Sequence, residues 1–325
     1  RSTLFPYTTL FRSGRRTMYR YFDSHGEYNR PGDGEMNAKI LKGKAVAETL
    51  SNQIALDVED LSSSGKTPCL AIVRAGRRPD DLAYERGIVK RCDALGITAN
   101  VFELPENVSG NRLEETLIAL AEDDDVHGIL PFWPMPPQID RDILRRNIPP
   151  GKDIDCFGAG SFATVFDREL PGFLPCTAEA VMETLHFYDI PIEGTRTVIL
   201  GRSMLLGRPL SLLMLDANAT VTICHSKTRD MASVAGDADI LVSAMGRARM
   251  VDASYIKRGA VVIDVGINDD GAGGICGDVD FESARSVAGA VTPVPGGIGS
   301  VTTTILIRNT VSACKRTVRG EETDR

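Results

Sequence analysis

The sequence lacks the patterns that mark a metal site or a disulfide-rich fold. Its seven cysteines are scattered with no C-x-x-C pair, and none of its four histidines stands at metal-ligand spacing from another. An odd number of cysteines, mostly inside apolar runs, is typical of reduced thiols in a protein of the cytoplasm. We therefore expect a cytoplasmic protein without a bound metal.

Long apolar runs and basic blocks are missing as well. No apolar stretch approaches the roughly 18 residues of a membrane-spanning helix. The formal net charge is −7, and no block of lysine and arginine is available to neutralise the phosphates of a nucleic acid. The sequence therefore favours neither a membrane nor a nucleic acid as a partner.

What is present is the composition of a globular protein of two domains. Hydrophobic residues make up 42% and charged residues 25% of the 325 residues. Residues 1–35 differ from the rest, because they show no sustained periodicity and residues 2–13 resemble translated sequencing-adapter read-through. We expect this extension to be disordered and without function, with the native protein starting at Met36 or, alternatively, at Met18.

Helical and strand periodicities alternate along the remaining chain. In its first half, helices are predicted at 39–61, 79–95, 112–122 and 140–146, and strands at 69–73, 98–104 and 128–130. In its second half, helices are predicted at 178–188, 209–215 and 301–317, and strands at 197–200, 219–224, 240–244, 260–265 and near 289–291. This order predicts an α/β fold made of two α/β lobes with a cleft between them.

The stretch 196–228 has the layout of a mononucleotide-binding unit. A β-branched and aliphatic run predicts a buried parallel strand, and Gly201 then begins a tight loop that closes at Gly207. A leucine-rich helix follows, with Pro209 as its first residue, and a second strand ends at Cys224. Free N–H groups and the helix dipole favour a phosphate at such a loop.

The end of the second strand indicates which nucleotide binds. Ser203 stands where the second glycine of G-x-G-x-x-G would be, so that fingerprint is weak. His225-Ser226-Lys227 offers no acid for a ribose 2′-hydroxyl, whereas Arg202 with Ser226 or Lys227 could embrace a 2′-phosphate. We predict NADP rather than NAD. The alternative is an ordinary crossover with a solvated Arg202 and Lys227.

Three motifs give the chain a resemblance to a known family. They are Leu174-Pro175-Cys176-Thr177, then Gly201-Arg202-Ser203 with Gly207, Pro209 and residues 219–226, and finally Thr292-Pro293-Val294-Pro295-Gly296-Gly297. With these motifs, residues 37–316 resemble the bifunctional methylenetetrahydrofolate dehydrogenase/methenyltetrahydrofolate cyclohydrolase family. The resemblance implies an N-terminal folate-binding catalytic lobe (36–170), a C-terminal Rossmann-type NADP-binding lobe (171–299), and a last helix (300–320) that packs back on the first lobe.

The same resemblance implies the ligands and the residues that hold them. The substrate would be 5,10-methylenetetrahydrofolate, the cofactor NADP and the assembly a homodimer. The cofactor would contact Gly201, Arg202, Ser203, Gly207, Ser226 and Ile267, with Arg202 and Ser226 on its 2′-phosphate. The substrate would contact Tyr84, Phe132, Asp155, Pro295, Gly296 and Gly297, and Tyr84 and Asp155 would position it for catalysis.

Each of these residues also has a structural reading that the sequence leaves open. The segment 295–297 would then be a plain turn, and Asp155 a residue that stabilises its own loop. Tyr84 and Phe132 would be ordinary residues of the lobe core.

Two positions differ from the family's pattern. The family places a lysine four residues after the tyrosine, on the same helix face, and here Ile88 follows Tyr84 at that spacing. The nearest lysine, Lys90, points roughly 200° further around the helix. Phe132 replaces the glutamine that partners the lysine, and the acidic loop keeps Asp155 but has cysteine in place of the glycine that follows it.

These differences affect the two reactions of the family unequally. Hydride transfer from the one-carbon bridge to nicotinamide depends mainly on positioning. Hydrolysis of the methenyl carbon needs protons to be shuttled, which Ile88 and Phe132 cannot do. We predict an NADP-dependent dehydrogenase with weak or no cyclohydrolase activity. The alternatives are a fully bifunctional enzyme, an NADP enzyme for a related pterin or another one-carbon carrier, and a catalytically impaired folate-binding paralogue.

Overall fold

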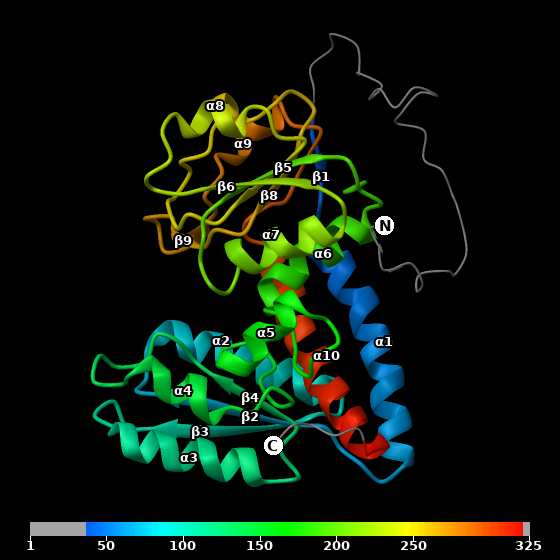
Figure 1. Ribbon diagram of the computed structural model, residues 1–325, viewed down its shortest axis with the longest axis vertical. Helices are drawn as coiled ribbons and strands as arrows, with labels where there is room; N and C mark the ends of the chain where they lie inside the picture. The colour runs from blue at the N-terminus through cyan, green and yellow to red at the C-terminus, as the bar shows by residue number, and fades with distance from the viewer. Residues whose placement is uncertain (1–36, 321–325) are drawn as a thin grey trace, which may run out of the picture. The chain divides into compact units, whose positions relative to one another are not determined.

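The computed structural model describes residues 37–320, so the expectation for residues 1–35 lies outside the described part of the chain. Within that part the chain folds into two lobes, each built on a parallel β-sheet with helices on both faces (Figure 1). This arrangement confirms the predicted α/β fold. The cleft expected between the lobes stays a prediction. None of the described helices is long and apolar enough to cross a membrane.

The first lobe contains a three-stranded sheet in the order β3-β2-β4. Its strands are β2 (Cys69–Ala75), β3 (Thr98–Leu104) and β4 (Gly128–Pro131), and its helices are α1 (Gly43–Ser63), α2 (Pro79–Ala94), α3 (Gly110–Glu122) and α4 (Arg141–Asn147). Because side chains alternate along a strand, β2 supplies two cores. Ala71 and Val73 pack with α3 and α4, whereas Leu70 and Ile72 belong to the core that contains α1 and α2.

The second lobe contains a six-stranded parallel sheet in the order β1-β11-β8-β7-β5-β6. Its strands are β1 (Lys39–Ile40), β5 (Arg196–Leu200), β6 (Thr220–Cys224), β7 (Ile240–Ser243), β8 (Val261–Asp264) and β11 (Ala290–Val291). Its helices are α6 (Cys176–Phe187), α7 (Gly207–Asp216), α8 (Met231–Ala235) and α9 (Phe281–Arg285). Ile199 and Val242 face α6 and α7, while Val198 and Leu241 share a core with α8 and α9.

The order of these strands determines where a ligand can bind. Strand β5 lies between β6 and β7, so the chain leaves β5 on one side and, after β6, crosses to the other. In doubly wound sheets such a change of direction opens a crevice at the carboxyl ends of the strands. The loops after β5, β6 and β7 are therefore the expected nucleotide site.

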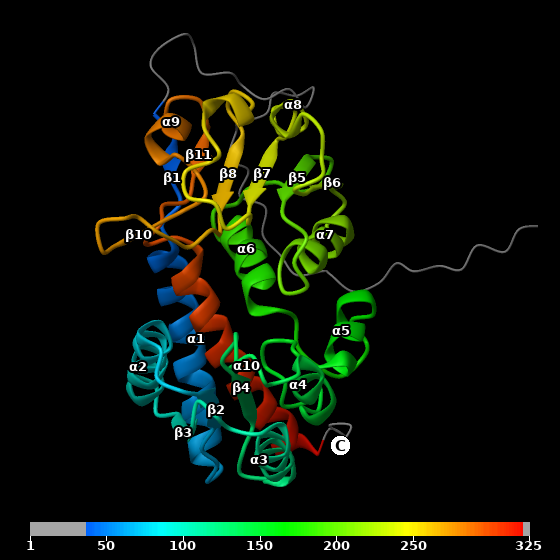
Figure 2. The same ribbon diagram turned by 90° about the vertical axis from the view of Figure 1, so that its left-hand side faces the viewer.

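Helix α10 (Ile298–Arg319) begins directly after the second lobe and returns to the first. It runs beside α1 and packs against α6, β2 and β4 (Figures 1 and 2). The side-chain amide of Asn309 donates to the carbonyl of Ile154 at 3.0 Å, and the Arg308 guanidinium pairs with Glu179 and Glu183 on α6. The predicted return of the last helix is confirmed.

The predicted elements differ from the structure mainly at the start of the chain. Lys39–Ile40 was expected to begin a helix, but it forms strand β1, parallel to Ala290–Val291 of β11, and the helix starts at Gly43. Pairing with a strand about 250 residues away overrides the local helical pattern. The short elements α5 (Ala159–Phe166), α8, α9, η1 (Ala253–Tyr255) and the hairpin β9 (Asn268–Asp269) with β10 (Ile275–Cys276) were not predicted.

Candidate active site

Helix α2 carries Tyr84 to the end of strand β4. The helix begins at Pro79, whose fixed φ suits the first helical position, and has Asp80 and Asp81 in its first turn. The ring of Tyr84 lies 5.3 Å from the ring of Phe132, centroid to centroid, at an interplanar angle of 38°. Phe132 is buried and its N–H donates to the carbonyl of Val73 at 2.8 Å, which fixes the aromatic pair at the edge of the sheet.

The position of the family's lysine is filled by a side chain without a proton to exchange. Ile88, one turn after Tyr84, is completely buried in the core that also contains Phe132. Lys90 is exposed on another face of α2. Tyr84 as a residue is 41% exposed, but desolvation of its phenol and, next, the charge of Asp155 raise the pKa of Tyr84, so the phenol is neutral at physiological pH.

The basic side chain whose charge reaches Tyr84 from the same helix is Arg91. Its guanidinium donates from Nη1 to the carbonyl of Ser300 at 3.0 Å and to Oγ1 of Thr304 at 2.7 Å, both on α10. Its charge opposes the rise in the pKa of Tyr84. A guanidinium stays protonated at any physiological pH, so Arg91 cannot act as a general base.

The acidic loop between α4 and α5 holds two carboxylates, Asp153 and Asp155, with different surroundings. Asp153 is completely buried and accepts hydrogen bonds from the N–H groups of Phe157 and Gly158 and from the Ser161 hydroxyl. Asp155 is half-buried, and its Oδ1 accepts the N–H of Cys176 at 3.0 Å. Burial raises the pKa of Asp155 to about 6, against the effect of this hydrogen bond. Asp155 therefore stabilises a loop–helix junction, and its charge also raises the pKa of Tyr84.

Cys156 occupies the position at which the family has glycine, and its backbone conformation is one that glycine favours. Its φ is 58°, in the left-handed region that residues with a Cβ atom seldom adopt. The thiol is fully buried. The loop thus holds Cys156 in a backbone conformation that glycine adopts more readily.

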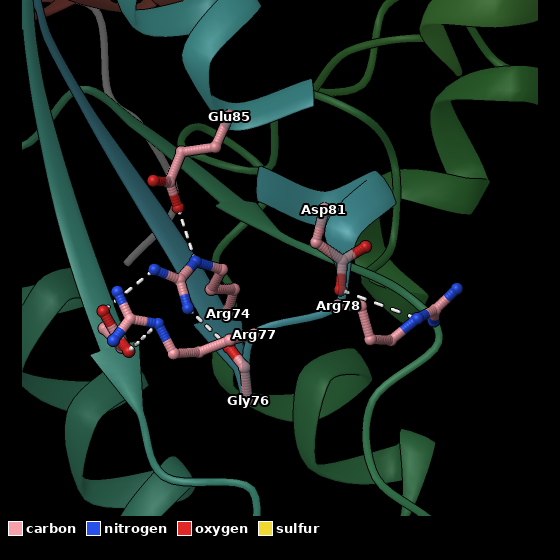
Figure 3. Close-up of polar contacts among 7 residues, drawn as sticks. Arg74, Gly76, Arg77, Arg78, Asp81 and Glu85 are labelled. Carbon is pink, nitrogen blue, oxygen red and sulfur yellow. Dashed lines mark hydrogen bonds and ion pairs between the residues drawn. The ribbon is translucent and has the colours of Figure 1, made fainter. Parts of the chain in front are cut away.

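A buried ion network fixes helix α2 on the sheet (Figure 3). The Arg74 guanidinium at the end of β2 is only 2% exposed, and it contacts Glu85 on α2 at 2.5 Å and Glu103 on β3 at 2.9 Å. It also donates to the carbonyl of Gly76. Because Glu85 is the neighbour of Tyr84, this network sets the position of the helix that presents the phenol.

On the nucleotide side, two glycines close the loop after β5. Gly201 has a φ of 130°, and a Cβ atom there would lie 2.4 Å from the carbonyl oxygen of Ala244. A Cβ atom on Gly207 would lie 2.1 Å from the carbonyl oxygen of Gly201. Only glycine allows these approaches. Helix α7 begins at Gly207, so Pro209 is its third residue and not its first; it is tolerated because N–H groups of the first turn have no helical partner.

The side chains expected to bind a 2′-phosphate lie at adjacent strand ends. Arg202 and Ser203 follow β5, Ser226 follows β6, and all three are exposed. The last residues of the two strands, Leu200 and Cys224, are register partners. The turn after β6 is closed by the N–H of Lys227 donating to Nδ1 of His225 at 3.1 Å. A cation and a hydroxyl, with no carboxylate among residues 225–229, fit a phosphate better than a free ribose hydroxyl.

Two buried carboxylates organise the loops after β7 and β8. Asp278 is completely buried and accepts the N–H of Met245 at 2.6 Å, the N–H of Arg247 at 2.8 Å and the amide of Asn268 at 3.0 Å. Asp264 accepts the N–H groups of Gly266, Asp278 and Val279, and burial raises its pKa to about 6. These bonds present Ile267, which is 66% exposed, beside the nucleotide loops.

The segment Pro295-Gly296-Gly297 joins β11 to α10. The peptide bond before Pro295 is cis, and Gly296 has a φ of 100°. The carbonyl of Gly296 accepts the N–H of Gly43 at the start of α1 at 2.9 Å, and a Cβ atom on Gly297 would lie 2.4 Å from the carbonyl oxygen of Pro293. The segment is therefore held tightly between the beginnings of two helices.

Both lobes match domains of known proteins. Residues 41–155 match the catalytic domain of tetrahydrofolate dehydrogenase/cyclohydrolase, and residues 175–318 match the NAD(P)-binding domain of the same enzymes. The chain belongs to the tetrahydrofolate dehydrogenase/cyclohydrolase family. The resemblance inferred from the three sequence motifs is thereby confirmed.

Individual members of the tetrahydrofolate dehydrogenase/cyclohydrolase family match nearly end to end. Bifunctional protein FolD 1 of Desulfitobacterium hafniense is 46% identical over 277 residues, which cover 85% of this chain and 99% of that protein. The bifunctional FolD enzyme of Campylobacter jejuni has a structure with a TM-score of 0.83 and 37% identity, covering 86% of this chain and 99% of that one. The Trypanosoma brucei enzyme, solved with NADP cofactor and inhibitor, has a TM-score of 0.83 and 38% identity, covering 87% and 99%.

The structure brings together some of the predicted family residues. Tyr84 and Phe132 form an aromatic pair at the end of β4, and the charge of Asp155 acts on the Tyr84 phenol. Arg202, Ser203 and Ser226 form a second group at the ends of β5 and β6, with Gly201 and Gly207 shaping their loop. The segment 295–297 lies directly before α10, the helix that Arg91 of α2 contacts at Ser300 and Thr304. Among residues 37–320, no cluster of three histidine, cysteine or acidic side chains could hold a metal ion.

Several residues that organise this family site were not predicted. Arg91 stands seven residues after Tyr84, on the same helix face, and that spacing was the available signal. Arg74 could have been suspected as a charged residue inside an apolar strand. Asp278 gave no signal, because its partners lie about 30 residues earlier in the chain and are backbone groups.

Proposed function

We propose that this protein is an NADP-dependent 5,10-methylenetetrahydrofolate dehydrogenase with little or no methenyltetrahydrofolate cyclohydrolase activity. The observation that carries the proposal is the complete burial of Ile88, one helical turn after Tyr84, at the position where the family has its lysine. The nucleotide loops, in contrast, have what an NADP site requires. The residues expected to bind NADP for the dehydrogenase reaction are therefore present, whereas the lysine expected to serve the cyclohydrolase reaction is replaced.

NADP would bind at the loops after β5 and β6. Arg202 and Ser226 are exposed at neighbouring strand ends and would hold the 2′-phosphate, while the close packing of Gly201 and Gly207 leaves backbone N–H groups for the pyrophosphate. Ser203 and Ile267 would line the same cofactor. A relative from Trypanosoma brucei was solved with NADP, which agrees with this choice.

In the dehydrogenase step the protein's contribution is positioning. NADP held at these loops would supply a hydride acceptor for the one-carbon bridge of 5,10-methylenetetrahydrofolate, and the substrate nitrogens would stabilise the cation that remains. Tyr84 and Phe132 would hold the ring system of the substrate, and Asp155 would accept its N–H groups. Pro295, Gly296 and Gly297 would contact both ligands. No side chain has to transfer a proton at the reacting carbon.

The cyclohydrolase step also requires groups that transfer protons. Water attacks the methenyl carbon, and protons must move as the ring opens. Ile88 and Phe132 carry no exchangeable proton, Arg91 cannot be deprotonated, and the phenol of Tyr84 is neutral with a raised pKa. Asp155, whose charge acts on the phenol, has a pKa of about 6. Relatives at 46–48% identity are named bifunctional, so full bifunctionality is the competing proposal.

A coupled assay tests this function. Purified protein would be given 5,10-methylenetetrahydrofolate with NADP and, separately, with NAD. We expect reduction of NADP, much slower reduction of NAD, and accumulation of the methenyl product. Accumulation of 10-formyltetrahydrofolate above the uncatalysed rate would support the bifunctional alternative.

Two further alternatives are separated by binding measurements. Trp133 follows Phe132 and is 39% exposed, with the Arg141 guanidinium 5.5 Å from its ring centroid, so its fluorescence should report a ligand at Phe132. Quenching by pterins but not by folates would favour a related pterin as substrate. Absence of thermal stabilisation by saturating NADP would favour a catalytically impaired paralogue.

Two expectations remain, for the cellular compartment and for the oligomeric state. All seven cysteines are free and buried, which agrees with a cytoplasmic protein. We also propose a homodimer, which size-exclusion chromatography with light scattering would test.

A further inference from the structure

An exposed indole follows the aromatic pair at the end of β4. Trp133 comes directly after Phe132, whose ring pairs with that of Tyr84, and it is 39% exposed. The guanidinium carbon of Arg141, on α4, lies 5.5 Å from the centroid of the indole, a distance at which the ring face attracts a cation. Consecutive Cα atoms are about 3.8 Å apart, so a substrate on the Tyr84–Phe132 pair has to extend by little more than one residue to reach the indole.

The charge of Arg141 is not paired within the described chain. No carboxylate of residues 37–320 forms an ion pair with it, and its buried Nε atom has no hydrogen-bond acceptor there. The acids next to it in the sequence are used elsewhere, since Asp140 accepts the N–H of Asp142 at 2.9 Å and Asp142 pairs with Arg145 at 3.1 Å. A buried donor without an acceptor is uncommon and costs free energy. Arg141 is therefore a cation with unused capacity to bind an anion.

A second arginine contacts the same segment but has an acidic neighbour. Arg78, which precedes α2, donates from Nη1 to the carbonyl of Pro134 at 3.4 Å, and its Nε lies 3.9 Å from a carboxylate oxygen of Asp81 (Figure 3). This contact ties the residue after Trp133 to the start of the helix that carries Tyr84. Of the two arginines, Arg141 is the one whose charge is uncompensated.

We propose that Arg141, held on the indole of Trp133, binds a carboxylate at the glutamyl end of the folate substrate. The inference rests on the proposed function and deepens it, because it names the part of the substrate that this edge of the first lobe recognises. A folate consists of a pterin, an aminobenzoyl group and at least one glutamate, and only the glutamate carries carboxylates. With the ring system on Tyr84 and Phe132, the aminobenzoyl group extends towards Trp133 and the glutamate reaches Arg141.

A guanidinium stacked on an aromatic ring suits this task. Its planar fork presents two N–H groups to one carboxylate, and the ring restricts the orientation of that plane. Arg141 is half-buried and Trp133 is exposed, so the rest of the glutamyl end stays in solvent. Arg141 should therefore contribute to binding of a substrate with a glutamate and not to binding of one without it. Because the site lies at the surface, added salt should weaken this contribution.

The test compares two substrates that differ in the glutamate alone. One is 5,10-methylenetetrahydrofolate, and the other is the analogue in which an uncharged methylamide replaces the glutamate. Arg141→Met removes the donors and keeps the apolar stem, Arg141→Lys keeps a charge, and Trp133→Leu removes the ring that holds the guanidinium. Arg145→Met, at an exposed arginine of the same helix, is the matched control. The KM and kcat for both substrates and the Tm would be measured for each full-length protein.

The expected result is a loss of discrimination between the two substrates. The wild type should have a KM about tenfold lower for the folate than for the methylamide, as for one charge-assisted hydrogen bond. Arg141→Met should raise the KM for the folate to that of the methylamide and leave the KM of the methylamide unchanged. Arg141→Lys should restore part of the difference, Trp133→Leu should narrow it, and Arg145→Met should match the wild type. A partial loss of folded protein lowers both turnover rates and leaves the ratio of the two KM values unaltered.

Other results would overturn the inference. Equal KM values for the two substrates in the wild type would show that the glutamate is not bound. An Arg141→Met variant in which both KM values rise by the same factor would show that Arg141 only maintains the shape of the site.

Failure of the proposed function would look different, because the wild type would then reduce NADP with neither substrate. The glutamyl site can still be tested by fluorescence, since Trp133 is the single tryptophan of the chain. Quenching by p-aminobenzoyl-glutamate but not by p-amino-N-methylbenzamide, lost in Arg141→Met, would support it. Equal quenching by the two fragments, or quenching that Arg141→Met retains, would contradict it.

Discussion

Among single residues, Asp155 combines two tasks that usually fall to different side chains. One oxygen accepts the N–H of Cys176 and so fixes the start of α6, and the carboxylate also acts electrostatically on Tyr84. Burial raises its pKa from 3.8 to about 6. It is therefore ionised at physiological pH but at a cost to the folded state, which is typical of a group retained for binding.

Asp155→Asn should separate the two tasks. A raised pKa means that the folded protein binds the proton more tightly than the unfolded chain, so the wild type loses stability as the pH rises from about 4 to about 6. The variant lacks this loss and keeps an oxygen for Cys176, so its Tm at about pH 7.5 should equal or exceed that of the wild type. Its KM for the folate should rise by about tenfold or more.

Thermal scans at about pH 4 and pH 7.5, with steady-state kinetics at the higher pH, check both expectations. A variant that is less stable than the wild type at the higher pH and has an unchanged KM would contradict both expectations.

Arg202 should determine the choice between the two nicotinamide cofactors. Arg202→Gln removes the cation at the end of β5 and should lower kcat/KM with NADP by about 10- to 100-fold, as for the loss of a charge-assisted hydrogen bond, with little effect on NAD. Arg258→Gln is the matched control, because that exposed arginine precedes the amino end of β8, whereas Arg202 follows the carboxyl end of β5. Equal losses with both cofactors would show that Arg202 does not contact the 2′-phosphate.

Among the elements, helix α2 is held by a polar network around Arg74 and by Arg91, which donates to Ser300 and Thr304 of α10. Arg74 reaches Glu85 on the helix and Glu103 on the neighbouring strand, so one buried guanidinium joins three elements. Buried ion pairs contribute little net free energy, but removing one partner leaves an unpaired charge. The contribution of this network to stability is therefore best measured by removing one of its charged partners.

Arg74→Met should lower the free energy of unfolding by about 3 kcal/mol, because Glu85 then stays buried without its cation. Arg77→Met should change it by less than about 0.5 kcal/mol, since the Arg77 side chain is 73% exposed although it also contacts Glu103. Urea unfolding of the two variants provides the comparison. A loss of similar size in both would show that the burial of Arg74 is not the reason for its effect.

The elements themselves were largely predictable from periodicity and from the residues that begin and end them. Helix α2 was expected at 79–95 and is found at Pro79–Ala94, because proline and two acids mark its start. Strand β1 was not predictable, because two residues form a strand only by pairing with β11 at the other end of the chain. The same limit applied to Arg91, whose partners Ser300 and Thr304 lie more than 200 residues away.

At the scale of the whole molecule, one apolar core contains residues from both sheets. Leu70 and Ile72 of the first lobe share it with Ile199 and Val242 of the second, and α1, α6 and α10 supply much of the rest. The segment 295–297 leads directly into α10, so a change near Tyr84 can reach it through one helix. This continuity is why the folate and nucleotide sites are expected to act together.

We propose that this protein oxidises its folate substrate but does not hydrolyse the product, since Ile88 and Phe132 stand where the family has a lysine and a glutamine. The decisive quantity is the rate at which purified protein hydrolyses 5,10-methenyltetrahydrofolate, compared with its dehydrogenase turnover in the same buffer and with the uncatalysed rate. We predict hydrolysis close to the uncatalysed rate beside a clear dehydrogenase turnover. Hydrolysis as fast as the dehydrogenase turnover would contradict the claim.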